Sequence, residues 1–250
     1  QEAPPPTSTG PAEGAGPGGT HPLDRHQQGV AAVVTRSHRE VPTGFTVVRA
    51  EVDAVLDVLE RLAEETGGML GLAEVVIAAV AAAHRDFPLF FGRLLDDRTV
   101  ELAGAPHVGV TVDADGALYV PVVRRAHELS VEDLADTLMD FRMKALGRDF
   151  AAHELADGNI AVSLNPDPGV LLVHPIVLWP QVCMVSVGAV GTECRIDPAT
   201  GAAVPVRCVH LGVAYDHRVV NGRDAALFAR RIASALEQPG WVSRPAGAPV

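Results

Sequence analysis

The chain has 250 residues, 48% of them hydrophobic, which is enough for one sizeable core and excludes a chain that is disordered throughout. Its 20 lysine and arginine residues against 31 aspartate and glutamate residues give a net charge of -11, which would repel a nucleic-acid backbone. The longest strongly apolar run, residues 75–83, is shorter than the ~20 residues that span a bilayer, so we expect neither a nucleic-acid nor a membrane partner.

The cysteines and the first residues of the chain indicate a compartment. Cys183, Cys194 and Cys208 form no CxxC pair, and any disulfide scheme leaves one of them unpaired, which favours a reducing environment. Cys183 and Cys208 lie among valines and are predicted to be buried small hydrophobic residues rather than nucleophiles. The chain starts at Gln1 without a basic-then-apolar leader, so we expect no signal peptide and a cytoplasmic protein.

Composition divides the chain into three parts. Residues 1–22 contain six Pro and five Gly, and such a stretch buries too little apolar surface to offset its ordering entropy. It is predicted to be a flexible arm. Residues 23–240 are predicted to form one folded domain, and residues 241–250 a C-terminal tail.

Hydrophobic periodicity predicts helices early in the domain and strands clustered late. Apolar residues recur at helical spacing from Glu51 until Gly67, and Ser130 with Asp133 has the spacing of a capping box. The turn residues 113–116 separate two β-rich runs, as in a hairpin. This order predicts an α+β domain with a large mixed β-sheet and helices packed on one side. The predicted helices lie at about 51–66, 72–85, 130–145 and 223–237, and the predicted strands at 107–112, 117–123, 159–163, 181–190 and 203–215.

The most informative stretch is DHRVVNG at residues 216–222, where a long apolar strand ends and the last helix begins. Such a junction presents a side chain on a rigid support. Asn221 is a good N-cap, Gly222 lets the backbone turn, and Asp224 suits the positive end of the helix dipole. Residue types alone therefore favour a structural interpretation of this stretch over a catalytic role for His217.

Four segments of the chain resemble segments of one family and occur in the family's order. This resemblance favours a catalytic role for His217 over the structural interpretation. DHRVVNG resembles the DHRxxDG signature of the catalytic domains of 2-oxo acid dehydrogenase acyltransferases, which share their fold and active-site histidine with chloramphenicol acetyltransferase. The resemblance extends from about residue 22 to 239 and implies a chloramphenicol acetyltransferase-like fold. The other matching segments are GALYVPVVR at 116–124, similar to the family's GLIVPVIR hairpin; NIAVS at 159–163, similar to its strand ending in TISN; and WPQ at 179–181 with VG at 187–188, similar to its PPQ…VG strand.

The resemblance assigns roles to three residues. In the family, the histidine is the general base for a thiol or hydroxyl that attacks an acyl thioester, and a serine donates a hydrogen bond to the oxyanion. By motif these roles fall on His217 and Ser163, and Asn221 takes the position of the motif's second acidic residue. The implied co-substrate is a coenzyme A thioester, in the first place acetyl-coenzyme A. The family also places its active site between the subunits of a trimer, so we expect a homotrimer.

The chain departs from the family pattern around these residues. Where the family reads MRKAIARRM, residues 26–34 contain no arginine, so Gln27 and Asn221 could together replace a charged pair. The loop LNPDPG at 164–169 and Trp179 are where we expect the acceptor pocket to differ. No metal is expected, because the other candidate histidines, His107, His174 and His210, lack partners at metal-ligand spacing.

Three functions remain open. The first is a stand-alone acyltransferase that moves an acyl group to a hydroxyl of a small molecule, as in the acetylation of a tetronate intermediate of polyketide antibiotics. The second is the catalytic core of a 2-oxo acid dehydrogenase complex, which exchanges an acyl group between dihydrolipoamide and coenzyme A. The third is an inactive trimeric scaffold, which the presence of both His217 and Ser163 disfavours. The changed loop and the changed arginine segment favour the first.

Overall fold

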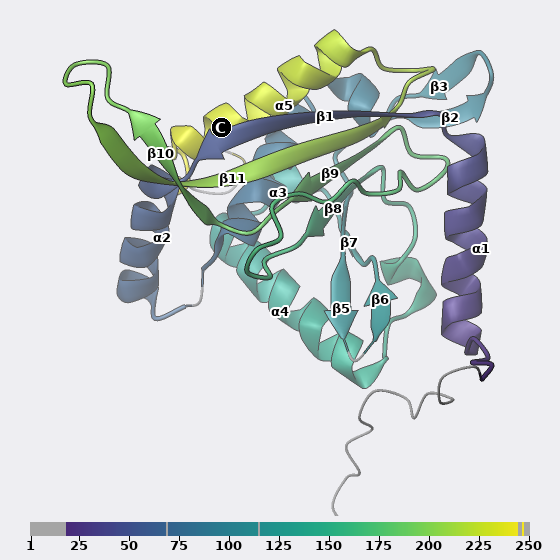
Figure 1. Ribbon diagram of the computed structural model, residues 1–250. Helices are drawn as coiled ribbons and strands as arrows, with labels where there is room; N and C mark the ends of the chain where they lie inside the picture. Colours follow the sequence, from purple (N-terminus) through teal and green to yellow (C-terminus); the bar gives the residue numbers. More distant parts are fainter. Residues whose placement is uncertain (1–18, 69, 115, 245–246, 248–250) are drawn as a thin grey trace, which may run out of the picture.

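A mixed β-sheet covered by helices on one face dominates the computed structural model, which describes residues 19–68, 70–114, 116–244 and 247 (Figure 1). Most of the expected arm, residues 1–22, lies outside the described residues. The helices and strands are, in chain order, α1 (Arg25–Glu40), β1 (Thr43–Glu51), α2 (Asp53–Thr66), α3 (Leu72–Ala83), β2 (Arg93–Asp96), β3 (Thr99–Glu101), β4 (Val108–Val110), β5 (Val112–Ala114), β6 (Ala117–Tyr119), β7 (Val122–Val123), α4 (Val131–Gly147), β8 (Ile160–Leu164), β9 (Cys183–Val187), β10 (Gly191–Ile196), β11 (Ala203–Asp216) and α5 (Gly222–Glu237), with short 3-10 helices at Pro88–Phe91, Ala126–Glu128 and Ala152–Glu154.

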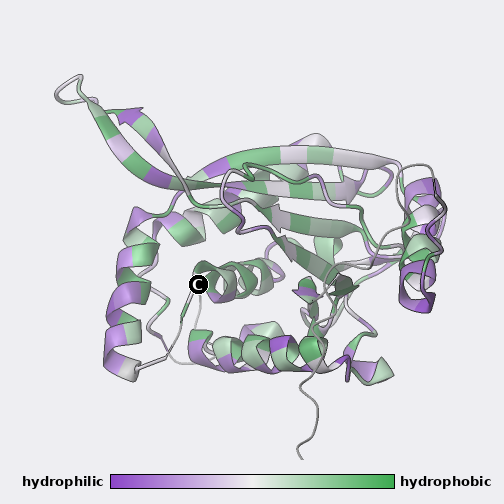
Figure 2. Ribbon diagram, turned by 60° about the horizontal axis from the view of Figure 1, so that its bottom comes forward, coloured by the Kyte–Doolittle hydropathy of each residue, from purple (hydrophilic) through white to green (hydrophobic). Residues whose placement is uncertain are grey.

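The main sheet has the strand order β1-β11-β9-β8-β4-β7, and β10 pairs with the first half of β11. Strand β8 is parallel to both β4 and β9, whereas β11 is antiparallel to β1, β9 and β10. The sheet is therefore mixed, as the α+β prediction requires. The β10–β11 hairpin extends away from the rest of the molecule in both ribbon views (Figures 1 and 2).

Helices α2 to α5 lie over one face of the sheet and share one large core with it. Helix α3 is buried along nearly its whole length, which explains why its sequence is apolar on almost every face. Figure 2 shows it as a hydrophobic helix in the middle of the helix layer. The capping box predicted for α4 is present, since Ser130 Oγ accepts from the Asp133 N–H at 3.0 Å and Asp133 accepts from the Ser130 N–H.

A stretch without helices or long strands, residues 165–182, covers part of the opposite face. Val177 is fully buried there against Met184 and Ala214 of the sheet. The Ser186 hydroxyl donates to the Val173 carbonyl at 2.6 Å, and the rings of Phe45 and His174 stack with centroids 4.2 Å apart. This connection joins two parallel strands, β8 and β9, and thus crosses the sheet from one end to the other.

The structure adds elements that the periodicity did not predict, namely α1, β1, the β2–β3 hairpin and β10. Helix α1 buries only Ser37 among its described side chains. Its C-terminal end is fixed to residue 179, because the Ser37 hydroxyl accepts from the Trp179 N–H and Arg36 lies 3.5 Å from the centre of the Trp179 ring. Among the described residues, no helix combines the length and the apolarity that are needed to cross a membrane.

The predicted hairpin around residues 113–116 is present but divided. Strands β5 and β6 form their own two-stranded ribbon, while β4 and β7 belong to the main sheet. Thr111 lies at the division, where its N–H donates to the Val162 carbonyl and its hydroxyl accepts from the Leu164 N–H at 3.3 Å. Between β6 and β7 the division falls at Pro121, which has no N–H to donate to the hydrogen bonds of the sheet.

Candidate active site

The end of the longest strand positions His217. Strand β11 ends at Asp216, and the next residue, His217, is exposed. Its N–H donates to the Pro42 carbonyl at 3.0 Å, so the antiparallel alignment with the start of β1 continues one step beyond the strand. The imidazole packs near the Tyr215 ring, with centroids 5.4 Å apart. The backbone of His217 is thus fixed while its side chain faces solvent, which suits a base that must reach a substrate.

The neighbours of His217 in the motif form an ion pair between a buried carboxylate and an exposed guanidinium. Asp216 is only 1% exposed, and its carboxylate accepts from the backbone N–H, Nε and Nη2 of Arg218, the last at 2.6 Å. The side-chain hydrogen bond to the Asp216 carboxylate raises the pKa of the Arg218 guanidinium. The Asp216 carbonyl also accepts from the N–H groups of Val219 and Val220 at 3.0 Å, which closes the turn. Asp216 and Arg218 are therefore positioning residues that hold the strand end on which His217 lies.

Gly44 of β1 leaves the space that the Tyr215 and His217 rings occupy. A Cβ atom at position 44 would lie 2.5 Å from Tyr215 Cε2 and 2.9 Å from His217 Cδ2, distances that real side chains do not tolerate. The close approach of β1 to these rings therefore requires a glycine.

Gly44→Ala is expected to displace both rings and to destabilise the fold by about 1–3 kcal/mol, the usual cost of overpacking. Any catalytic turnover that depends on His217 should fall with it. Urea denaturation and steady-state kinetics measure the two effects. Gly191→Ala is the matched control, because Gly191 also lies in a strand and nothing stands within 4 Å of its Cβ position. Equal stability and activity of the two variants would contradict this account of Gly44.

Asn221 is the N-cap of α5, as its residue type predicts. Its carboxamide oxygen accepts from the Asp224 N–H at 3.0 Å, and its Nδ2 donates to the Asp224 carboxylate at 2.7 Å. The side chain is thereby committed to the turn that follows His217. The described residues show no contact between Gln27 and Asn221: Gln27 lies in the first turn of α1, where its N–H donates to the Asp24 carboxylate at 2.7 Å.

Ser163 is half-buried on β8, next to the last residue of that strand. Its Oγ accepts a hydrogen bond from Asn165 Nδ2 at 3.2 Å. The Asn165 backbone N–H in turn donates to the Val187 carbonyl at 3.0 Å. A hydroxyl has one O–H donor besides its acceptor lone pairs. Because Asn165 approaches as the donor, the Ser163 proton is available to another acceptor, as an oxyanion donor requires.

Ser163 lines a groove of about 820 Å³ between α4, the β5–β6 ribbon and the loop after β8. Leu118, Leu138 and Leu146 give this groove apolar walls, and Arg142 gives it a cation. Pro166 and Asp167 of the changed loop also line it, so the departure from the family sequence lies beside Ser163 as predicted. The other predicted departure, Trp179, is not among the lining residues.

One chain does not bring His217 and Ser163 together. Ser163 pairs with Ser186, and Ser186 pairs with Gly212, which lies five residues before His217 on β11. At about 3.3 Å per residue, and two strand spacings of about 4.8 Å, the two residues are roughly 15–20 Å apart at opposite ends of the sheet. An acyl group cannot contact both side chains of the same chain.

The remaining candidate residues have structural partners. His210 lies 3.6 Å from the Glu193 carboxylate, and His107 Nδ1 accepts from the Arg125 N–H at 3.0 Å. Burial and the nearby Arg124 lower the pKa of His107. Cys183 and Cys208 are buried, as predicted, and burial raises the pKa of both thiols. Both therefore remain thiols rather than nucleophilic thiolates near neutral pH.

The chain shares its fold with acyltransferases of known structure. The structure is similar to that of a chloramphenicol acetyltransferase, with a TM-score of 0.55 and 14% identity over 86% of this chain and 96% of that chain. It is more similar to the structure of the dihydrolipoamide acetyltransferase of Azotobacter vinelandii, with a TM-score of 0.82 and 24% identity over 97% of this chain and 99% of that chain. That structure comes from work on a serine, a histidine and an asparagine in the catalytic mechanism. The predicted fold class is confirmed.

Residues 16–242 match the protein-family model described as 2-oxoacid dehydrogenases acyltransferase (catalytic domain). The chain belongs to this family. It is 28% identical over 221 residues to the dihydrolipoyllysine-residue acetyltransferase component of the pyruvate dehydrogenase complex of Mycoplasma pneumoniae, covering 85% of this chain and 54% of the relative. The chain thus spans about half the length of that curated relative.

Proposed function

We propose that this domain transfers an acyl group, in the first place acetyl, between coenzyme A and a dihydrolipoyl group. Two observations carry the proposal: His217 lies on a fixed strand end, and the Ser163 hydroxyl accepts a hydrogen bond from Asn165, which leaves its own proton to donate. The family supports the acceptor, since it is that of the 2-oxoacid dehydrogenase acyltransferases and the relative compared above is a dihydrolipoyllysine-residue acetyltransferase. Nothing in the described residues of the groove favours a tetronate as acceptor.

In this reaction His217 takes the proton from the attacking thiol, and the sulfur forms a bond to the thioester carbon. The carbonyl oxygen becomes an oxyanion that accepts a hydrogen bond from Ser163. When the intermediate collapses, the bond to the departing sulfur breaks and His217 returns the proton to it. General base catalysis of this kind contributes ~10²–10⁴ in rate, and one oxyanion donor ~10²–10³.

The separation of His217 and Ser163 supports a site shared between two copies of the chain. In a cyclic oligomer, the His217 end of one sheet faces the Ser163 groove of its neighbour, and every copy contributes to two sites. A homotrimer is the arrangement we propose. The residue spacing fits the same site: in the Azotobacter vinelandii protein the asparagine follows the histidine by four positions, as Asn221 follows His217.

An acceptor assay tests the function. The protein is incubated with acetyl-coenzyme A and either dihydrolipoamide or a panel of hydroxylated small molecules that includes a hydroxymethyl tetronate, and released coenzyme A is followed. We expect efficient acetylation of dihydrolipoamide. Transfer to a hydroxyl compound with none to dihydrolipoamide would identify a stand-alone O-acyltransferase instead. Absence of transfer to every acceptor would leave the scaffold interpretation.

A further inference from the structure

The asparagine beside Ser163 lies one position further along the chain than in the family segment. In TISN the asparagine directly follows the serine, whereas here Leu164 separates Asn165 from Ser163. Successive side chains of an extended chain point to opposite faces, so residues 163 and 165 share a face. The Asn165 N–H extends the pairing with β9 by donating to the Val187 carbonyl at 3.0 Å, and Pro166 disfavours a helical conformation at 165. The Asn165 side chain is therefore directed to the face of Ser163.

The backbone around Ser163 is fixed from both neighbouring strands. The Val162 carbonyl accepts from the Thr111 N–H at 3.0 Å, and the Leu164 N–H donates to the Thr111 hydroxyl at 3.3 Å. On the other side, Ser163 pairs with Ser186 of β9. The freedom that remains is the rotation of the Ser163 side chain among the staggered wells of χ1 and the rotation of its hydroxyl. A neighbour that restricts these rotations determines where the proton points.

The carboxamide of Asn165 restricts them as a donor. Asn165 Nδ2 lies 3.2 Å from Ser163 Oγ and 3.4 Å from the Ser163 carbonyl oxygen. Because a carbonyl oxygen only accepts, the amide turns its NH₂ group to this side. The Ser163 hydroxyl accepts a hydrogen bond from it, and accepting polarises the O–H group and strengthens it as a donor. Both residues line the groove, so this strengthened donor is available there.

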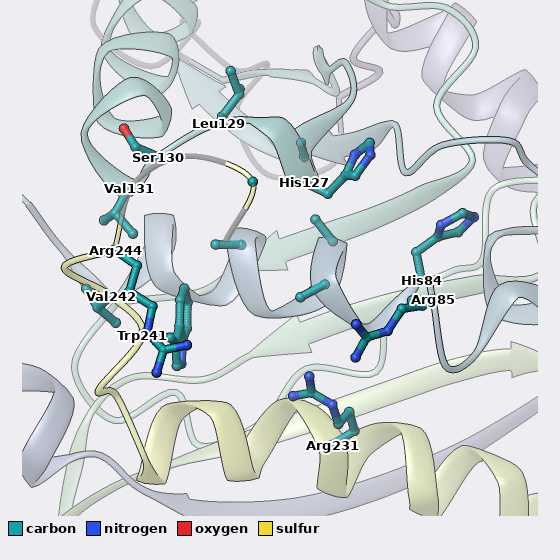
Figure 3. A pocket seen from close by; sticks show the side chains of 15 residues that line it. His84, Arg85, His127, Leu129, Ser130, Val131, Arg231, Trp241, Val242 and Arg244 are labelled. Carbon is teal, nitrogen blue, oxygen red and sulfur yellow. The ribbon is translucent and has the colours of Figure 1, made fainter. Parts of the chain in front are cut away.

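Ser130 shows the opposite arrangement in the same chain. It lies at the wall of another cavity, of about 260 Å³, in the helix layer, and neither Ser163 nor Asn165 lines that cavity (Figure 3). The Ser130 hydroxyl donates to the Asp133 carboxylate at 2.9 Å and accepts from the Asp133 N–H at 3.0 Å. The carboxylate thus takes the proton that an oxyanion would need. An aspartate at position 165 would do the same to Ser163.

We propose that Asn165 is a positioning residue for acyl transfer, which holds the Ser163 hydroxyl as a hydrogen-bond donor for the oxyanion. The inference rests on the proposed function, because the oxyanion forms only when an acyl thioester is attacked. Asn165 acts on the rate through Ser163 and requires an amide, not merely a side chain of that size. Since the oxyanion exists only near the transition state, a change at 165 alters kcat and leaves the KM of both substrates unchanged.

Three variants test the proposal in the assay with acetyl-coenzyme A and dihydrolipoamide. Asn165→Ala releases the hydroxyl among its rotamers and should lower kcat about tenfold. Asn165→Asp has nearly the same shape but accepts the Ser163 proton, so kcat should fall as far as in Ser163→Ala, by ~10²–10³. Asn165→Ala added to Ser163→Ala should change kcat by less than about twofold, because its effect requires the hydroxyl.

Asn159→Ala is the matched control. Asn159 directly precedes β8 as Asn165 directly follows it, and it is not among the residues that line the groove. Its carboxamide accepts from the His107 N–H at 2.9 Å and donates to the Ala105 carbonyl at 2.8 Å. Loss of these hydrogen bonds should lower the urea midpoint, while kcat of the folded protein stays within about twofold of normal. The control thus separates a loss of stability from a loss of positioning.

Three results would overturn the proposal, provided that circular dichroism shows the variants folded. The first is a kcat of Asn165→Asp as high as that of Asn165→Ala, since the carboxylate would then not compete for the proton. The second is a tenfold loss that persists when Asn165→Ala is added to Ser163→Ala. The third is an effect confined to KM, which would assign Asn165 to the shape of the groove.

Failure of the proposed function appears in the unmodified protein and is thereby distinguished from failure of this inference. If the unmodified protein acetylates a hydroxyl compound in place of dihydrolipoamide, the acceptor is wrong, and the same ratios between the variants are expected with the hydroxyl compound. If it acetylates no acceptor, the positioning role falls together with the function. Ratios of about ten and ~10²–10³ for the alanine and aspartate variants, at unchanged KM, are the expected result.

Discussion

Replacing His217 with alanine is expected to lower the turnover number for acyl transfer by ~10²–10⁴, because the variant lacks the group that accepts the proton of the thiol. Folding should not change. The side chain of His217 is exposed, and its hydrogen bond to the Pro42 carbonyl comes from the backbone. The measurements are release of coenzyme A from acetyl-coenzyme A with dihydrolipoamide, the far-ultraviolet circular dichroism spectrum and the urea midpoint.

His153→Ala is the matched control, since His153 is likewise exposed but lies in a short 3-10 helix far along the chain from the motif. It should retain full activity. Near-normal turnover of His217→Ala would remove the base from the mechanism, whereas a loss of the folded spectrum would show that the residue acts through stability. The two explanations are thus separated by the same samples.

Mixed oligomers of two inactive variants are expected to regain activity. Ser163→Ala lacks the oxyanion donor and should retain about 10⁻² to 10⁻³ of the turnover number. His217→Ala lacks the base. If each site takes His217 from one copy and Ser163 from the next, a trimer that contains both variants has one intact site, about a third of the normal number.

Co-expression of the two variants with different affinity tags, followed by purification through both tags, provides the mixed oligomer. Its activity is compared with that of His217→Ala purified through the same two tags, which should stay inactive. Mixed oligomers without activity would contradict a shared site. The sheet would then have to rearrange within one chain, because about 15–20 Å separates the two residues in the observed fold.

Much of the fold could be predicted from the sequence because its central elements are amphipathic or wholly buried. Helix α3 and the second half of strand β11 are apolar runs that are buried almost throughout, and the Gly67 stop of α2 adopts the left-handed conformation with φ +68°. Helix α1 and strand β1 were not predicted, for two different reasons. Helix α1 buries almost nothing within one chain, and β1 is an edge strand whose burial pattern lacks a clean alternation.

The candidate site was predicted only as a set of residues. The motif and the family resemblance located His217, Ser163 and Asn221, but a spacing of 54 positions contains no information about strand direction. Strand direction determines how far apart Ser163 and His217 lie. Strands β8 and β11 run antiparallel with β9 between them, so residues near the C-terminal ends of both strands lie at opposite ends of the sheet. Gly44 and Asn165 were missed as well, because their roles depend on a packing distance and on a hydrogen bond.

The connection between β8 and β9 determines where the chain can change in length. From Val170 onward it is fastened to the sheet: the Val170 carbonyl accepts from the Ala189 N–H at 2.8 Å, and Gly188 lies so close to the Leu171 carbonyl that a side chain at 188 would collide with it. An insertion beyond Val170 would break these contacts. Residues 166–169 lie between Asn165, which is bound to Val187 and Ser163, and this second attached part, and Pro166 and Asp167 among them line the groove beside Ser163. Insertions and deletions at 166–169 can therefore alter the shape of the groove while the register of the sheet is preserved, which makes this short loop the natural place to engineer or to diversify acceptor choice.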